Sequence, residues 1–160
     1  MEFRISPLTF EELHSCVDVF IAALPGTESR AEWSREDAAI RLRELWDEPR
    51  QLGLIAHDLP GNETVGFVVG NYVQVAEGAS LRIGELCVHP SRQGFGLGSR
   101  LLLGMREVAT GAGAVSMYLM AEPATRAFCQ RLGFTPQQEW IVMGQRLGET
   151  SSAQFISKRV

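Results

Sequence analysis

The sequence contains little cysteine, and its three thiols are far apart. Cys16, Cys87 and Cys129 are the only cysteines among 160 residues, too few for a disulfide framework, and no CxxC pair is present to hold zinc. We therefore expect no metal site and a reducing, cytoplasmic setting. The sequence also has no apolar run near the ~18 residues of a transmembrane helix and no secretory signal at its start. We expect no membrane association.

The sequence has no run of lysine and arginine either. Its net charge is −4, whereas nucleic-acid-binding proteins are usually basic, so we expect no nucleic-acid partner. The charge is unevenly distributed: residues 1–79 carry 14 acids and 6 arginines, whereas residues 80–135 carry 6 arginines and 3 glutamates. Either these blocks mark solvated faces, or the protein handles one cationic and one anionic partner.

The composition that remains is that of an ordinary globular protein, with 45% hydrophobic and 21% charged residues. A length of 160 residues favours a single domain over residues 1–160, because no linker, repeat or low-complexity stretch divides the chain. We expect the polar tail, residues 148–160, to fray or to form an edge strand.

Hydrophobic periodicity predicts a mixed α/β chain. A capping box at Thr9–Glu12 indicates the start of a first helix, and Pro25-Gly26 indicates its end. Two helices then lead into an antiparallel meander, which does not fit the strict strand–helix alternation of a doubly wound fold. The predicted elements are a strand at 3–5, helices at 9–24 and 34–46, strands at 51–57, 64–75 and 81–89, a helix at 98–110 with Leu101, Leu102, Met105, Val108 and Ala109 inward, a strand at 114–121, a short helix at 123–132 and a strand at 140–147.

Gly94, Gly96 and Gly98 lie between a predicted strand and a predicted helix. Glycines there allow a tight loop whose amides point into one concavity at a helix N-terminus, which favours an anion such as a pyrophosphate. A P-loop is excluded because no lysine follows Gly98. The dinucleotide fingerprint GxGxxG fails because Ser99 and Leu101 occupy the third glycine position in the two possible registers. The alternative is a glycine-rich turn that holds no ligand.

The context of these glycines resembles a known motif. Gln93-x-x-Gly96-x-Gly98, after a strand that ends Val88-His89-Pro90 and before an amphipathic helix, is similar to the acetyl-CoA-binding motif of the GNAT superfamily of N-acetyltransferases. A second signature, residues 127–134, resembles that family's short helix ending in Gly-Phe. The order of the predicted elements is similar over residues 1 to about 147.

The resemblance implies a fold and a cofactor site. The fold would be a mixed, mostly antiparallel central sheet flanked by helices and splayed between its fourth and fifth strands. In this family, loop amides hold the pyrophosphate of acetyl-CoA, and the preceding strand pairs with the pantetheine arm and polarises the acetyl carbonyl. Arg92 and Arg100 are candidates for the phosphates, or are solvated helix-edge charges. The expected cofactor-binding residues are Leu86, Cys87, Val88, Arg92, Gln93, Gly94, Phe95, Gly96, Leu97, Gly98, Ser99 and Arg100.

The implied chemistry is direct attack of a neutral amine on the thioester. Glu85 is the candidate general base, because it is the only carboxylate in residues 81–89. Alternatively, Glu85 attracts the cationic substrate or pairs with Arg82. We expect a structural or exposed role for His89, which precedes a proline at the turn.

Cys129 departs from the family's pattern, since many members carry a tyrosine there that protonates the departing CoA thiolate. A thiol has a similar basicity to that thiolate but a shorter reach than a phenol. Three options follow: Cys129 donates the proton, another group such as Tyr118 or water donates it, or the protein turns over poorly. We expect Cys16 and Cys87 to be core thiols.

These features predict an N-acetyltransferase that moves an acetyl group from acetyl-CoA to a primary amine of a small cationic substrate. The stretch with Trp33 and the strand Gly84–Val88 look most like small-amine acetyltransferases of the aminoglycoside type. The alternatives are a non-catalytic acyl-CoA-binding or regulatory module, motivated by Cys129, and a protein N-acetyltransferase. Family members are often dimers, so a homodimer could form through the tail after Gly148.

Overall fold

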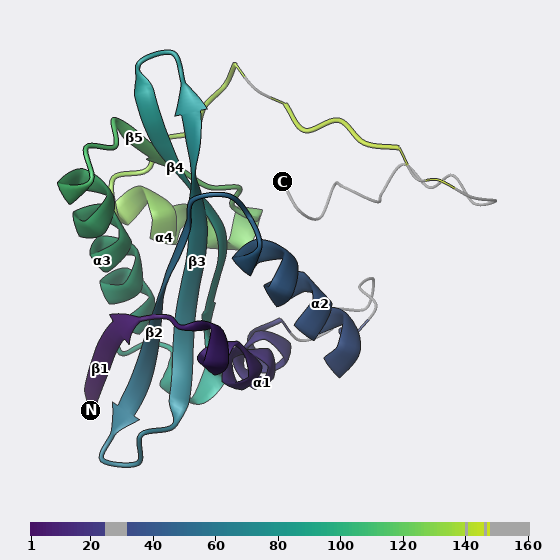
Figure 1. Ribbon diagram of the computed structural model, residues 1–160, viewed down its shortest axis with the longest axis vertical. Helices are drawn as coiled ribbons and strands as arrows, with labels where there is room; N and C mark the ends of the chain where they lie inside the picture. Colours follow the sequence, from purple (N-terminus) through teal and green to yellow (C-terminus); the bar gives the residue numbers. More distant parts are fainter. Residues whose placement is uncertain (25–31, 140, 146, 148–160) are drawn as a thin grey trace. The chain divides into compact units, whose positions relative to one another are not determined.

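The computed structural model describes residues 1–24, 32–139, 141–145 and 147. The chain divides into two compact units, residues 1–117 and 118–160, and each is described by itself. The elements are β1 (Glu2–Pro7), η1 (Phe10–Glu12), α1 (Leu13–Ala23), α2 (Arg35–Trp46), β2 (Gln51–Leu59), β3 (Thr64–Val75), β4 (Gly78–Val88), η2 (Pro90–Arg92), α3 (Leu97–Gly111), β5 (Ser116–Tyr118), η3 (Pro123–Thr125) and α4 (Arg126–Arg131) (Figure 1).

The sheet has the strand order β1-β2-β3-β4-β5. Neighbours from β1 to β4 are antiparallel, with Ile55 opposite Phe67 and Phe67 opposite Cys87, whereas β5 runs parallel to β4. This mixed, mostly antiparallel sheet flanked by helices confirms the expected fold class.

The fifth strand is short and pairs only with the beginning of β4. The Val115 amide donates to the Ala79 carbonyl at 2.8 Å, and the Ser116 hydroxyl donates to Ser80 at 2.7 Å. Three residues of strand span only about 10 Å, so β5 reaches no further than the middle of β4. Within the described part of residues 1–117, the outer edge of β4 from Glu85 to Val88 therefore has no neighbouring strand.

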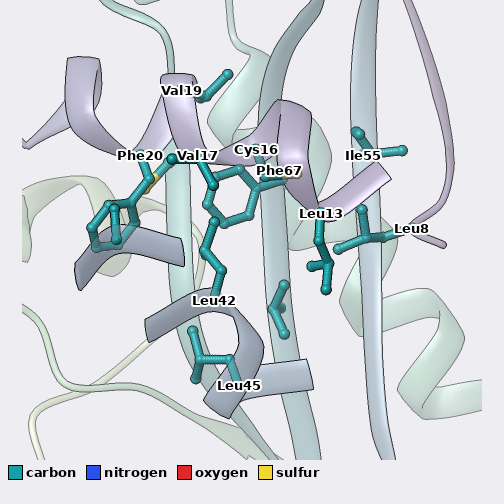
Figure 2. Packing of buried hydrophobic residues seen from close by; sticks show 13 residues of the cluster. Leu8, Leu13, Cys16, Val17, Val19, Phe20, Leu42, Leu45, Ile55 and Phe67 are labelled. Atoms are coloured by element: carbon teal, nitrogen blue, oxygen red, sulfur yellow. The ribbon is translucent and has the colours of Figure 1, made fainter. Parts of the chain in front are cut away.

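Helices cover both faces of this sheet (Figure 1). On one face, α1 and α2 cover a hydrophobic cluster that contains Phe20, Leu42 and Phe67 (Figure 2). These residues and Cys87, which belongs to the same cluster, are almost fully buried. Leu97, Leu101, Leu102 and Met105 of α3 are buried too, and α3 packs on β2, β3 and β4. Val108, which we predicted to face inward, is 46% exposed, because it lies at the flank of the stripe that Leu101, Met105 and Ala109 form.

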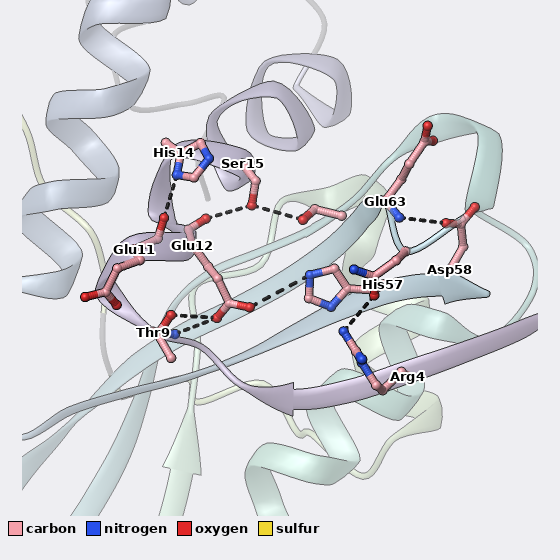
Figure 3. Close-up of polar contacts among 11 residues, drawn as sticks. Arg4, Thr9, Glu11, Glu12, His14, Ser15, His57, Asp58 and Glu63 are labelled. Atoms are coloured by element: carbon pink, nitrogen blue, oxygen red, sulfur yellow. Dashed lines mark hydrogen bonds and ion pairs between the residues drawn. The ribbon is translucent and has the colours of Figure 1, made fainter. Parts of the chain in front are cut away.

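Polar contacts fix the start of α1 (Figure 3). The Thr9 amide donates to the Glu12 carboxylate at 2.9 Å, as the predicted capping box requires, and the Thr9 hydroxyl donates to the same carboxylate at 2.9 Å. The other Glu12 oxygen lies 3.9 Å from Nε2 of the buried His57. The Thr64 hydroxyl donates to Ser15 at 2.9 Å, which ties α1 to β3.

A β-bulge brings α2 close to β4. Val69 lies opposite Glu85 but Gly70 lies opposite Ile83, so Gly84 is the extra residue of β4. A Cβ at Gly84 would lie 2.6 Å from Cδ2 of Leu45 in α2. Glycine is therefore needed here for the helix to pack this closely on the strand.

The second unit contains η3, α4 and the segment that follows. Gly133 has φ +90° and ends α4, as predicted. The predicted strand at 140–147 is wrong for residues 141–145, which form no strand, and Ile141 and Met143 are 79% and 82% exposed. An apolar segment forms a strand only against a partner, and the described residues after Tyr118 contain no strand. Trp140, Arg146 and the tail 148–160 lie outside the described residues, as does Pro25-Gly26.

Candidate functional site

The candidate site begins where β4 ends. The chain passes from Val88 through η2 to a loop at Gly94–Gly96 and enters α3 at Leu97. Gly94 and Gly96 have φ values of +80° and +78°, the left-handed region that side chains other than glycine rarely adopt. A Cβ at either position would meet no atom within 4 Å. The loop therefore borders open space on the side that these glycines face, rather than other protein atoms.

The loop is fixed at both ends. The Gln93 side-chain amide donates to the Val88 carbonyl at 3.0 Å, and the His89 amide donates to the Val65 carbonyl at 2.9 Å. Nδ1 of His89 lies 2.8 Å from the Ser91 hydroxyl, which fits the structural role predicted for this histidine. At the other end Leu97 is 1% exposed. A loop held in this way needs little reorganisation to bind a ligand.

The first turn of α3 has unpaired backbone donors. The first amide with a helical partner is that of Arg100, which donates to the Gly96 carbonyl at 3.0 Å. The amides of Leu97, Gly98 and Ser99 precede it and have no acceptor within the helix. Since α3 is 15 residues long, its dipole adds to the attraction of these amides for an anion.

The two arginines that flank the loop contact β1 and β2. Arg92 donates to the Asp58 carboxylate at 2.8 Å, in a pair whose side chains are 26% and 13% exposed. The Arg92 guanidinium holds the pKa of the Asp58 carboxyl below its ordinary value. Arg100 donates to the Phe3 carbonyl at 3.4 Å. Asp58 was not among the predicted site residues, because in the sequence it is only a polar residue before a Pro-Gly-Asn turn.

The predicted residues of β4 lie next to the bulge. Cys87 belongs to the hydrophobic cluster under α1 and α2. Glu85 lies two residues earlier on the same face of the strand. Its carboxylate is 3.8 Å from Nη2 of Arg41 in α2. Leu86 and Val88 alternate with them and point to the α3 side of the sheet. Glu85 therefore faces α2, while the outer backbone edge of Leu86–Val88 is left without a strand partner in the described part of residues 1–117.

All three cysteines are free and buried. Burial and the charge of Glu12 raise the pKa of Cys16 to about 12, and burial raises the pKa of Cys87 well above its ordinary value. Both are core thiols, as predicted. Cys129 belongs to the second unit, where it is 6% exposed and burial raises its pKa. A role for Cys129 as the acid stays a prediction, and Tyr118, at the end of β5, is 40% exposed.

A cleft of about 330 Å³ lies beside the base of the loop. It contains two carboxylates from the acidic first half of the chain together with His89, and its lining residues are Ser15, Asp18, Val19, Glu63, Thr64, Val65 and His89. Asp18 is paired with Arg35, which lowers the pKa of the Asp18 carboxyl. No group of three His, Cys, Asp or Glu side chains placed to hold a metal occurs among the described residues, and none of the described helices is long and apolar enough to cross a membrane.

Solved structures with this fold are acetyltransferases in several cases. An acetyltransferase from Trypanosoma brucei matches with a TM-score of 0.69 and 19% identity over 89% of this chain and 99% of its own. Glucosamine-6-phosphate N-acetyltransferase from Arabidopsis thaliana matches with a TM-score of 0.69 and 14% identity, over 92% of this chain and 100% of its own. The aminoglycoside 6'-N-acetyltransferase AAC(6')-Ih from Acinetobacter baumannii matches with a TM-score of 0.68 and 15% identity, over 92% of this chain and 100% of its own.

A search of curated protein sequences finds no significant match. The model of the acetyltransferase (GNAT) family, by contrast, matches residues 16–134, a range that includes the sheet from β2 to β5, the glycine loop and α4. The family that the sequence resembles is therefore confirmed. The chain belongs to the GNAT acetyltransferase family.

Proposed function

We propose that the protein transfers an acetyl group from acetyl-CoA to a primary amine of a small cationic molecule. One observation carries this proposal: the two left-handed glycines precede a first helical turn with unpaired amides, at the end of a strand whose outer edge has no strand partner in the described part of residues 1–117. A phosphate-bearing ligand with an extended arm fits such an arrangement, because the loop offers donors to the phosphates and the strand edge offers donors and acceptors to the arm.

Residues of the loop would bind the pyrophosphate. The amides from Gly94 to Ser99 donate to phosphate oxygens, and the absence of side chains at Gly94 and Gly96 lets these oxygens approach the backbone. Arg92 is held by Asp58 at 2.8 Å, so it shapes the loop and adds a positive charge near it. Arg100 adds a second positive charge at the start of α3.

Acetyl-CoA supplies an acetyl group already activated as a thioester. The backbone of Leu86, Cys87 and Val88 pairs with the arm of the cofactor along the open edge, and one of these amides donates to the acetyl oxygen. Such a fixed donor stabilises charge that develops on that oxygen during attack by the amine.

Two side chains would move protons. Glu85 takes a proton from the substrate ammonium, so that the neutral amine can form the new C–N bond as the C–S bond breaks. The nitrogen then loses its second proton to solvent and becomes the amide. Cys129 returns a proton to the sulfur that leaves. A buried thiol with a raised pKa carries its proton at physiological pH, and the same rise makes it a weaker acid than an exposed thiol.

Features of the whole chain support the finer parts of this proposal. The acidic first half favours an acceptor that carries positive charge, and aminoglycoside 6'-N-acetyltransferases are among the proteins with a similar fold. Three free cysteines fit a reducing compartment such as the cytoplasm.

A non-catalytic acyl-CoA-binding module is the second candidate. It is favoured by Cys129, which stands where many family members carry the tyrosine that protonates the thiolate. Both candidates require CoA to bind at the glycine loop, and only the enzyme releases CoA thiol when an amine is present.

Two measurements test the proposal. A thermal-shift titration with CoA should raise the melting temperature of the native protein and leave that of Gly96→Glu unchanged, since the glutamate puts a negative charge into the phosphate loop. Free thiol is then followed with acetyl-CoA and a panel of polyamines, aminoglycosides, amino acids and peptides. If millimolar CoA leaves the melting temperature of the native protein unchanged, both candidates fail. If CoA binds and no amine releases thiol, the non-catalytic candidate stands.

A further inference from the structure

Helix α2 lies directly over the part of β4 where the proposed chemistry takes place. Leu45 packs against Gly84 so closely that a Cβ there would be 2.6 Å from its Cδ2 atom. Arg41 is one helical turn before Leu45, and its guanidinium lies 3.8 Å from the Glu85 carboxylate, the next residue of the strand after Gly84. The bulge thus fixes a positive charge opposite the candidate base.

This pair differs from the ion pair that links β4 to the residues just after α2. Arg82 lies 3.1 Å from Glu48 and donates to Asn71 at 3.0 Å, which are hydrogen-bonding distances. At 3.8 Å, Arg41 and Glu85 attract each other but are too far apart for a hydrogen bond. Among the described residues, Arg41 makes no hydrogen bond, and its side chain is 35% exposed. Its donors are therefore available to a ligand.

A guanidinium and a carboxylate that face each other across a gap complement a molecule with the reverse arrangement of charges. An ammonium beside an anionic group places its positive end against Glu85 and its negative end against Arg41. Arginine suits this task because its planar fork of donors matches a carboxylate or a phosphate. An amine without an anion leaves Arg41 unmatched and brings a second positive charge near it, which is unfavourable.

We propose that the acceptor carries an anionic group next to the ammonium that gives it its positive charge, and that Arg41 recognises the anionic group while Glu85 faces the ammonium. The inference rests on the proposed function, because it places the acceptor at Glu85. Arg41 then determines specificity: it selects among amines by their neighbouring group and takes no part in the transfer of the proton or of the acetyl group.

The experiment compares amines that differ only in the anion. The pairs are lysine with cadaverine, phosphoethanolamine with ethanolamine, and glucosamine 6-phosphate with glucosamine; the first tests a carboxylate and the other two test a phosphate. Each amine is assayed by release of CoA thiol, and kcat and KM are measured for the native protein and for Arg41→Gln, Arg41→Lys and Arg43→Gln. Arg43 is the matched control, since it is on the same helix but pairs with Asp47 at 2.8 Å.

We expect the native protein to prefer the anionic member of at least one pair by about tenfold or more in kcat/KM, the effect of one charge-assisted hydrogen bond. Arg41→Gln should reduce this preference to about twofold or less by raising KM for the anionic member alone. Arg41→Lys should retain part of it, because the charge remains, and Arg43→Gln should retain all of it.

Three results would overturn the inference. Equal kcat/KM within every pair for the native protein removes the preference that Arg41 is meant to create. An equal loss for both members in Arg41→Gln shows a structural or catalytic role instead. If none of the six amines releases thiol, the inference fails; the thiol assay on the wider amine panel then decides whether the proposed transferase activity fails with it.

Discussion

Gly96 provides the sharpest test of the glycine loop, because the effect of a side chain there can be separated into two parts. At φ +78° with no atom within 4 Å of an added Cβ, Gly96→Ala creates no clash. Its effect on stability comes from the left-handed backbone alone, which costs about 1–2 kcal/mol for a residue with a Cβ. Part of this cost is offset, because alanine has less freedom than glycine in the unfolded chain, an effect of about 0.4–1 kcal/mol.

The expected net destabilisation is therefore about 1 kcal/mol, or roughly 3 °C in melting temperature for a chain of this size. Gly113 is the matched control: its φ is +80° and an added Cβ would also meet nothing within 4 Å. It lies beyond the other end of α3, whose 15 residues span about 22 Å. Gly113→Ala should lower the melting temperature by a similar amount.

The two variants should differ in CoA binding. A methyl group at residue 96 occupies the space beside the loop amides and displaces at least one hydrogen bond to a phosphate. Such a bond is worth about 1.5–3 kcal/mol, which corresponds to about 10- to 150-fold weaker binding. Isothermal titration calorimetry with CoA measures this directly. Equal CoA affinities for Gly96→Ala and Gly113→Ala would refute the placement of the phosphates at the loop.

Three further experiments test the Asp58–Arg92 pair, the role of Cys129 and the packing at Gly84. Because Arg92 lowers the pKa of Asp58, the charge of Asp58 stabilises the fold above the ordinary pKa of about 4, and this contribution is lost as the pH falls further. The melting temperature of Asp58→Asn should therefore lie below that of the native protein at pH 7 and approach it at pH 3. A difference in melting temperature that does not narrow would contradict the pairing. If Cys129 is the acid, Cys129→Ala should lower kcat for thiol release while Cys129→Tyr retains it, whereas equal rates for both variants and the native protein would exclude residue 129. Gly84→Ala should lower the free energy of unfolding, measured by urea denaturation, by about 1–3 kcal/mol through overpacking. The same substitution should cost less when it is made in Leu45→Ala, where the side chain it would meet is shorter. Equal costs in the two backgrounds would show that the 2.6 Å approach is relieved elsewhere.

Local patterns were enough to predict most of the first unit. The capping residues at Thr9–Glu12, the Val- and Phe-rich run of β3 and the glycines between β4 and α3 each act within a few residues, so the sequence alone indicates the element. The family resemblance of the loop then supplied the fold class. The two ion pairs of the site could not be predicted in this way.

Asp58–Arg92 joins residues 34 positions apart, and Arg41–Glu85 depends on the bulge that sets α2 over β4. Each pair exists only once the sheet has formed. The strand predicted at 140–147 is wrong in its described residues for a related reason. Alternation predicts which residues of a strand share a face, but whether the strand forms depends on a neighbour elsewhere in the chain.

The central claim is that the backbone amides between Gly94 and Ser99 hold the phosphates of CoA. It is tested most directly by following the amide chemical shifts of the isotope-labelled protein during titration with CoA. The account predicts that the largest changes fall on Gly94–Ser99, followed by Leu86–Val88, and that Gly113 does not move. Saturable binding of CoA with unchanged shifts at Gly94–Ser99 and large shifts elsewhere would contradict it.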